Sequence, residues 1–401
     1  MDREALVLRN RTMAEAFHRT ALKHRVRRTL LLAASRIPAV RRRRAETGRI
    51  LLIRPDHLGD VLLTTPAITA LRRALPTARL HALVGPWSAD VLANYRDLDA
   101  VLTLPFPAFS RSPKPNWRSP YEIALHTANQ LRRVGYDAAL ILRPDHWWGA
   151  LVTQLAGIPR RIGYALPDTA PFLTDALPLE HQHVVLQSAR LVETLTDTHI
   201  TTDMLPLDFP VLQDDRYWAQ GYLEEWDIAP VRPVVTIHPG SGTWVKRWDE
   251  ARWASVADEL HEQLNAAILF TGSDHELPMI SQIVEKMRHM PALVVGDANI
   301  GQLAAIYARS LVVLGPDSGP LHLAAAVGTP TVTLFGPADP FEFGTWGPPD
   351  RHIILTSNIG CRPCRVIDWG TDDPANHPCV RDITVERVLD AARRLAQRDR
   401  F

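Results

Sequence analysis

The chain has few cysteines, no long hydrophobic run and almost no net charge. Only three of its 401 residues are cysteine, an odd number that is too small for a disulfide scaffold and agrees with a reducing compartment. No apolar run approaches the ~20 residues that a membrane-spanning helix needs, and no cleavable signal pattern is visible. We therefore expect a soluble, cytoplasmic protein. With 46% hydrophobic residues, the chain can bury two cores of ordinary domain size.

The net charge of +1 hides an uneven distribution. Residues 1–44 contain thirteen Lys or Arg against three Asp or Glu, which leaves a net −9 for the rest of the chain. Apolar residues such as Phe17, Leu30 and Leu31 are interleaved with these cations. We expect a basic amphipathic segment that binds an anionic inner leaflet, since each cation there contributes about 1 kcal/mol. Nucleic-acid binding lacks a recognised module, and a solvated, partly disordered extension is the other alternative.

Apolar strands alternate with helical stretches along the body, which predicts parallel, doubly wound sheets. Strands are expected near 50–53, 80–84, 100–104, 138–142, 234–237, 267–271, 292–295, 311–314 and 331–335. Helices are expected near 66–75, 120–134, 183–197, 217–226, 321–327 and 385–396. A proline-rich stretch, residues 206–233, interrupts the alternation and is predicted to be a linker. The predicted parts are a basic extension (1–48), a first Rossmann-like domain (49–205), the linker (206–233), a second Rossmann-like domain (234–383) and a last helix (384–401).

Three segments lead from an apolar strand into a loop, and in two of them a helix follows. The last of them, residues 315–340, begins GPDSGPLHL. Free N–H groups at a helix start and the helix dipole favour a phosphate there. Because Pro320 has no N–H, the expected donors are Ser318, Gly319 and Leu321, whereas Asp317 is expected to shape the loop. A plain turn with an aspartate cap is the alternative.

The other two segments follow apolar strands earlier in the chain. In HPGSGTWVKRW, residues 238–248, the small residues Gly240 and Ser241 suit close approach of a diphosphate, and Lys246 offers a cation. A solvated surface loop has a similar composition. Residues 53–76 place Asp60 at a turn before a helix. Taken alone, Asp60 would be a cap or turn residue rather than a catalyst.

Taken together and in this order, the three segments resemble glycosyltransferase family 9, the family of the ADP-heptose:lipopolysaccharide heptosyltransferases. The first family pattern, R-x-x-x-x-G-D-V, is met by Arg54, Gly59, Asp60 and Val61. The second, H-P-G…K-x-W, is met by His238, Pro239, Gly240, Lys246 and Trp248. The third is met by Asp317 to Ala326 and by Gly336, Pro337, Asp339 and Pro340. The resemblance covers roughly residues 49–395.

This resemblance implies the GT-B architecture, in which two doubly wound Rossmann-like domains face a central cleft and the last helix crosses back to the first domain. It implies an inverting, metal-independent transfer of a sugar, a heptose, from a nucleotide-diphosphate donor such as ADP-heptose to a lipid-linked or cell-envelope glycan. The donor is a substrate, and no cofactor is expected. A sugar-nucleotide epimerase or hydrolase and a non-catalytic nucleotide-sugar binding protein are the alternatives.

The site residues that the resemblance implies lie in all three segments. Asp60 is the expected catalytic base. Lys246 would counter the charge that develops on the diphosphate, and an acidic residue after the strand at 267–271, here Glu276 rather than Asp274, would lie near the ribose. The expected substrate-binding residues are Gly240, Ser241, Lys246, Glu276, Asp317, Ser318, Gly319, Leu321 and His322.

Four further residues have the spacing of a metal site. Cys361, Cys364, His377 and Cys379 form C-x-x-C…H-x-C, a donor set typical of structural zinc. A structural zinc or iron site, a packed loop and an occasional disulfide are the three interpretations. No D-x-D motif lies in a convincing loop, so a catalytic metal is not expected.

Overall fold

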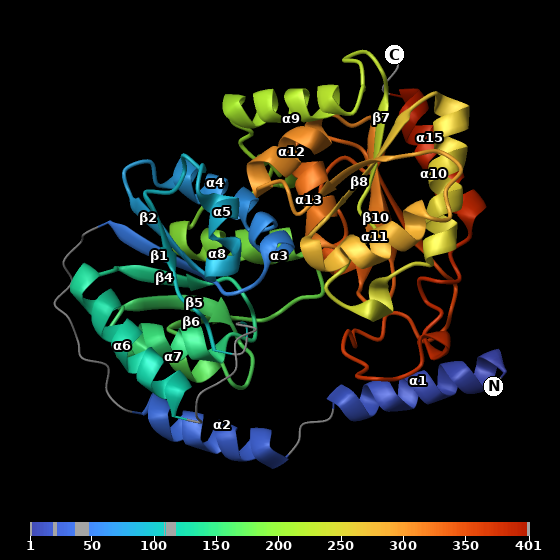
Figure 1. Cartoon of the computed structure of the whole chain (residues 1–401). Helices are drawn as coiled ribbons and strands as arrows, with labels where there is room; N and C mark the ends of the chain where they lie inside the picture. Colours follow the sequence, from blue (N-terminus) through green and yellow to red (C-terminus); the bar gives the residue numbers. More distant parts are fainter. Residues whose placement is uncertain (1, 19–21, 37–47, 108, 110–117, 399–401) are drawn as a thin grey trace. The chain divides into compact units, whose positions relative to one another are not determined.

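A computed structural model describes residues 2–18, 22–36, 48–107, 109 and 118–398. The chain divides into two compact units: an N-terminal unit of residues 20–206, and a C-terminal unit of residues 1–19 and 207–401. Each unit is built on one parallel six-stranded sheet with helices packed on it (Figure 1).

In the N-terminal unit the strand order is β3-β2-β1-β4-β5-β6. The strands are β1 (Arg49–Arg54), β2 (Arg79–Val84), β3 (Ala100–Thr103), β4 (Ala138–Ile141), β5 (Arg160–Tyr164) and β6 (Asp175–Leu177). The helices are α2 (Leu22–Ser35), α3 (Leu58–Leu62), α4 (Thr65–Ala74), α5 (Ala89–Leu92), α6 (Ser119–Val134), α7 (Trp147–Leu155) and α8 (Val184–Thr196). The central strands β1 and β4 are buried on both faces, which is why they are continuous apolar runs rather than alternating ones.

In the C-terminal unit the strand order is β12-β11-β10-β7-β8-β9. The strands are β7 (Val234–Ile237), β8 (Ala267–Gly272), β9 (Ala292–Val295), β10 (Val312–Pro316), β11 (Thr331–Phe335) and β12 (His352–Thr356). The helices are α1 (Arg3–His18), α9 (Gln213–Glu225), α10 (Glu250–Leu264), α11 (Leu277–Val284), α12 (Ile300–Arg309), α13 (Gly319–Ala326), α14 (Pro340–Phe343) and α15 (Val385–Arg398). Figure 1 shows α10 and α15 on one face of this sheet and α12 and α13 on the other.

Both sheets have the same winding, so the predicted fold class is confirmed. Numbered from the first strand of each unit, the order is 3-2-1-4-5-6 in both, the order of a Rossmann-like doubly wound sheet. In such sheets ligands bind beyond the carboxyl ends of the strands, where the order reverses. The reversal lies between β1 and β4 in the N-terminal unit and between β7 and β10 in the C-terminal unit.

The predicted linker and last helix both pack on the C-terminal unit. Helix α9 contacts α12, and Phe209 N donates to Ala326 O at 3.0 Å, so most of residues 206–233 belongs to this unit. Helix α15 contacts α10, β10, β11 and β12. Our expectation that the last helix crosses back was wrong, because its apolar stripe, including Val388 and Leu395, is buried in the core of the second sheet.

The basic N-terminal segment also differs from expectation. Its described residues form two helices: α1 belongs to the C-terminal unit, and α2 packs on the N-terminal unit. Leu31 lies in the hydrophobic core, whereas Leu30 is 64% exposed, so only part of the predicted apolar face remains at the surface. Arg28 pairs with Asp168 at 2.8 Å. The run Arg41 to Arg44 lies outside the described residues.

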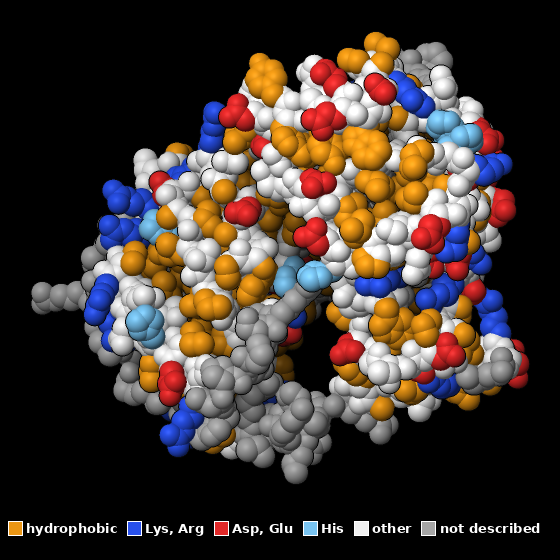
Figure 2. Space-filling view, in the orientation of Figure 1, with side chains coloured by type: hydrophobic (Ala, Val, Ile, Leu, Met, Phe, Trp, Pro, Cys, Tyr) orange, Lys and Arg blue, Asp and Glu red, His pale blue; other side chains and the backbone are white. Residues whose placement is uncertain are grey.

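Within the described residues, every helix is too short or too polar to cross a bilayer. Figure 2 shows hydrophobic side chains interspersed with acidic ones over α9 and α12. The large exposed apolar residues there include Leu212, Tyr217 and Trp226.

Candidate functional site

The loops after β7 and β10 meet where the second sheet reverses its order. Lys246 lies in a short 3₁₀ helix, η4 (Trp244–Lys246), and its Nζ is 2.5 Å from Asp317 Oδ2, directly after β10. Both side chains are largely buried, 19% and 7% exposed. Sequence reasoning placed both residues in the donor site but did not foresee this ion pair. The ion pair holds the ammonium group of Lys246 at the start of the loop that precedes α13.

Helix α13 begins at this loop with two unused backbone donors. Ser318 is its N-cap with an extended backbone, and its side chain makes no capping bond. Its buried Oγ has no hydrogen-bond partner among the described residues, and neither do Ser318 N and Gly319 N. Leu321 N, by contrast, donates to Ser318 O at 3.2 Å. The prediction of Leu321 as a free anion donor was therefore wrong, because the first turn of α13 already uses its N–H.

Two close approaches hold this anion loop against the end of β7. A side chain added at Gly315 would place its Cβ 2.5 Å from His238 O and 2.6 Å from a methyl group of Leu321. Only a glycine lets β10 pass so near to the loop after β7. The site therefore depends on contact between backbones as well as on polar side chains.

Glu276 lies beside Gly240. A Cβ at Gly240 would meet Glu276 Oε1 at 1.8 Å. The other oxygen, Oε2, accepts hydrogen bonds from Ser273 N at 2.8 Å and Ser273 Oγ at 2.9 Å, which closes a capping box on η5 (Asp274–Glu276). Ser241 Oγ donates to Thr243 O at 3.0 Å, so this hydroxyl shapes its own loop.

A buried polar chain lies behind these loops. His238 Nδ1 is 3.1 Å from Thr271 Oγ1, which is 3.0 Å from the hydroxyl of Tyr307. Burial lowers the pKa of His238 and raises that of Tyr307. Both groups are therefore neutral at neutral pH. His322 is also buried, in α13.

The corresponding position in the N-terminal unit carries an alternating chain of charges. Arg54, at the end of β1, lies 3.1 Å from Asp60 Oδ1 and 2.7 Å from Asp56 Oδ2. Asp56 also pairs with Arg143, which follows β4 and lies 2.6 Å from Asp145. Asp56 is nearly buried, whereas the side chain of Asp60, in the first turn of α3, is 37% exposed. Of the two carboxylates beside Arg54, Asp60 is therefore the reachable one.

Sequence reasoning missed Asp56, Arg143 and the neighbouring His146. Burial alone would raise the pKa of Asp56, but Arg54 and Arg143 hold it below the usual value. His146 is buried, and burial lowers its pKa to about 4. The signal that could have found these residues is their position directly after β1 and β4, the two strands at the point of reversal.

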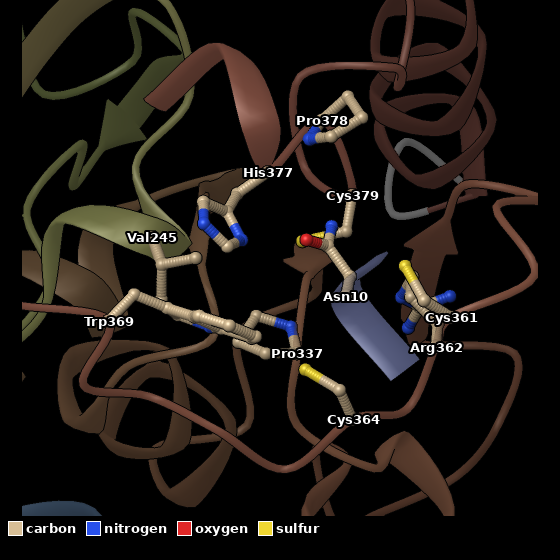
Figure 3. A pocket seen from close by; sticks show the side chains of 10 residues that line it. All are labelled: Asn10, Val245, Pro337, Cys361, Arg362, Cys364, Trp369, His377, Pro378 and Cys379. Atoms are coloured by element: carbon tan, nitrogen blue, oxygen red, sulfur yellow. The ribbon is translucent and has the colours of Figure 1, made fainter. Parts of the chain in front are cut away.

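The three cysteines and His377 line one small cavity (Figure 3). About 10 Å³ of it is accessible to a water-sized sphere, roughly the room for one water molecule. All three thiols are free in the structure, so the disulfide interpretation has no support here. Burial raises the pKa of Cys379 to about 12 and also raises that of Cys364.

Comparison with known proteins connects these loops with sugar transfer. The family model described as glycosyltransferase family 9 (heptosyltransferase) matches residues 124–369, more than half of the chain. The chain belongs to glycosyltransferase family 9. This member is 24% identical over 354 residues to lipopolysaccharide heptosyltransferase 2 of Escherichia coli K12, which covers 85% of this chain and 97% of the relative. It is therefore a glycosyltransferase.

Solved structures share the fold of this family 9 enzyme. A glycosyl transferase family 9 protein from Veillonella parvula covers 89% of this chain and 99% of its own, with 23% identity and a TM-score of 0.74. The E. coli ADP-heptose lps heptosyltransferase II covers 88% and 100%, with 20% identity and a TM-score of 0.70. The family model does not reach residues 53–76, so the role of Asp60 stays a prediction.

Proposed function

We propose that this family 9 enzyme transfers a heptose from ADP-heptose to a lipid-linked glycan of the lipopolysaccharide type, with inversion at the anomeric carbon. The names of its relatives support the donor and the class of acceptor. The observation that carries the proposal is the anion loop at the reversal of the second sheet, where Lys246 adjoins two unused N–H groups at the start of α13. Such a loop suits the diphosphate of a nucleotide sugar.

In the proposed reaction Asp60 takes the proton of the acceptor hydroxyl. The hydroxyl oxygen then forms a bond to the anomeric carbon as the bond from that carbon to the diphosphate oxygen breaks, and ADP leaves with the electron pair. Lys246, Ser318 N and Gly319 N stabilise the charge that develops on the leaving group. These cationic and N–H groups perform the task for which many transferases use a metal, which supports a metal-independent transfer.

A single displacement requires one carboxylate as base, and Asp60 takes that role in the proposed reaction. Asp56 is nearly buried and is engaged by two guanidinium groups, so it is poorly placed to act as a nucleophile. Asp145, after β4, is exposed as well and pairs with Arg143, but Asp60 is the carboxylate that occupies the family pattern. The burial of Asp56 supports inversion, because retention by double displacement needs a nucleophile in addition to a base.

The proposal is tested by the products that purified protein forms. With ADP-heptose and a lipopolysaccharide acceptor that lacks heptose, we expect ADP release to depend on the acceptor and the new bond to have the opposite anomeric configuration by NMR. Activity should persist when divalent cations are chelated. Equal ADP release with and without acceptor would show a hydrolase, and tight binding without turnover would show a binding protein. A panel of other nucleotide sugars in the same assay tests the choice of donor.

We also propose that the enzyme works at the inner face of the cell membrane, where a lipid-linked acceptor is found. The net charge of +10 on residues 1–44 supports attraction to an anionic surface. The exposed apolar residues Leu8, Phe17 and Leu30 could add apolar contacts. Leu31 is buried in the core and cannot contact a membrane. We therefore expect the attraction to depend more on charge than on apolar contacts.

A further inference from the structure

The loop between β12 and α15 gathers every cysteine of the chain around one cavity. Cys379 is buried, and Cys361 and Cys364 are partly buried; all three line the cavity together with His377 (Figure 3). Three thiols and one imidazole are the donors of a Cys₃His site, a common structural site for zinc. The transfer reaction proposed above uses none of these residues.

The imidazole of His377 is held in place by its neighbours. Its Nε2 lies 2.8 Å from Asp372 Oδ2, and the ring packs 4.3 Å from the Trp369 ring, measured between centroids. A carboxylate on one ring nitrogen selects the tautomer in which the other nitrogen, here Nδ1, offers its lone pair. Asp372 is itself held by Arg9 of α1 at 2.7 Å.

The charge near the cavity also suits an ion bound by thiolates. Three thiolates around a divalent cation leave one net negative charge, and Arg362 is the cationic residue that lines the cavity. Its guanidinium is fixed by hydrogen bonds to Gly336 O at 2.6 Å and to Ser357 O at 3.2 Å. A fixed guanidinium beside the sulfurs stabilises the anionic complex and would oppose binding of a bare cation by neutral ligands.

We propose that this loop binds one thiolate-preferring transition-metal ion, zinc or iron, through the sulfurs of Cys361, Cys364 and Cys379 and Nδ1 of His377. On binding, each thiol forms a bond from sulfur to the metal and releases its proton to solvent, with no change of oxidation state. In the described residues no three of these four donor atoms lie within 4.8 Å of one another. Metal binding therefore requires cysteine side chains to rotate between staggered positions, and one such rotation moves a sulfur by about 3 Å.

The site has a structural consequence, because α1 rests on the same loop. Asn10 Nδ2 donates to Asn376 O at 2.8 Å, Arg11 Nε donates to Gly360 O at 3.0 Å, and His18 Nε2 lies 3.0 Å from Cys364 O. The backbone that carries the ligands is therefore the surface on which α1 docks. Metal binding would order this surface and hold the N-terminal helix in place.

Metal content is the first test. Full-length protein without a histidine tag is purified without chelators, and zinc and iron are measured by plasma mass spectrometry. We expect about one ion of zinc or iron per chain, and a loss of at least about tenfold in C364S and in C379S. Ile367→Ala is the matched control, because Ile367 is exposed in the same loop and does not line the cavity; it should retain the metal.

A second test does not depend on whether the cysteine variants fold. Cobalt(II) added to metal-free wild-type protein should give the near-ultraviolet absorption of thiolate-to-cobalt charge transfer and protect all three thiols from a thiol reagent. Amide hydrogen exchange in residues 3–18 should become slower when the metal is restored. Asp372→Asn, which keeps every ligand, should weaken metal binding by about 10-fold to 100-fold.

Three outcomes would overturn the proposal. Folded wild-type protein could contain no stoichiometric zinc or iron and give no thiolate band with cobalt. Its cysteines could pair as a disulfide in freshly purified protein, which intact-mass spectrometry detects. C364S and C379S could retain the metal at wild-type level. Since none of these measurements involves sugar transfer, failure here leaves the proposed function standing, and the reverse also holds.

Discussion

At the scale of single residues, the two carboxylates beside Arg54 have different tasks. Asp60 is reachable from solvent, whereas Asp56 is nearly buried between Arg54 and Arg143. Because Arg54 is shared, Asp56 takes up part of the positive charge that would otherwise bear on Asp60 alone. The first carboxylate is a candidate base, and the second holds the arginines in position.

Asp60→Asn should remove the base while preserving the shape of the side chain. We expect kcat to fall by ~10²-fold or more, with donor affinity changed by less than a few-fold, because a base acts in the transition state. Single-turnover transfer and calorimetric titration with ADP measure the two quantities. Asp90→Asn, an exposed aspartate of the same unit, is the control. Retention of more than a tenth of wild-type turnover, with chemistry rate-limiting, would contradict the assignment.

Lys246→Ala should weaken ADP binding as well as turnover, since a cation on the diphosphate acts in both the ground state and the transition state. We expect a loss of about 1.5–3 kcal/mol in ADP affinity, the range for hydrogen bonds to charged groups. The same change at Lys286, which is exposed in the same unit, should have no effect on affinity. If calorimetry gives equal affinities for both variants, Lys246 does not contact the diphosphate.

Asp56→Asn should destabilise the N-terminal unit, since it breaks a buried ion pair with two arginines. We expect about 3–5 kcal/mol near pH 7. Because the folded-state pKa of Asp56 lies below its ordinary value, its stabilisation is present above about pH 4 and is lost as the pH falls through the folded pKa. The difference in unfolding free energy between wild type and variant should therefore become smaller in acid. Urea unfolding at several pH values measures this difference. A difference in unfolding free energy that is small or independent of pH would contradict a stabilising role of the Asp56 ion pairs.

At the scale of elements, the anion loop depends on how closely β10 approaches the loop after β7. Gly315→Ala would force a Cβ against His238 O, a backbone atom that cannot turn aside. We expect a loss of about 1–3 kcal/mol in stability and weaker ADP binding. Chemical denaturation followed by circular dichroism measures the first quantity.

A glycine elsewhere in the same unit should respond in the opposite direction. Gly221 lies inside α9, and nothing stands within 4 Å of an added Cβ. Gly221→Ala should therefore stabilise the unit by about 0.5–1 kcal/mol through helix propensity. If both glycine variants were destabilised equally, close packing at Gly315 would not explain the loss of stability in Gly315→Ala.

At the scale of the whole molecule, the concentration of positive charge in residues 1–44 predicts that membrane binding depends on salt. Deleting residues 1–44 is not a clean test, because Leu31 and α1 pack on the body. Replacing Arg41 to Arg44 by glutamine leaves those contacts intact. We expect the variant to bind anionic liposomes more weakly at low salt, and the difference from wild type to vanish near 1 M salt, where the Debye length is ~3 Å. Equal co-sedimentation at low salt would exclude these arginines as the attachment.

The local sequence determined most of the strands and the order of the loops. The strands at 234–237, 292–295 and 331–335 were predicted to the residue, because buried parallel strands are short runs of apolar and β-branched residues. Strands β5, β6 and β12 were missed. In β5 and β6, Arg160, Arg161 and Asp175 interrupt the apolar pattern, and neighbouring strands supply the pairing that the local pattern does not.

Tertiary structure alone decided which polar groups meet. Sequence named Asp60, Lys246 and Asp317 but could not show that Lys246 pairs with Asp317, or that Leu321 N is already bonded within its helix. Asp56 and Arg143 are 87 residues apart, and they meet because β1 and β4 are adjacent in the sheet. Local composition indicates which segments are buried. Contacts between distant charges depend instead on strand order, which nonlocal packing selects.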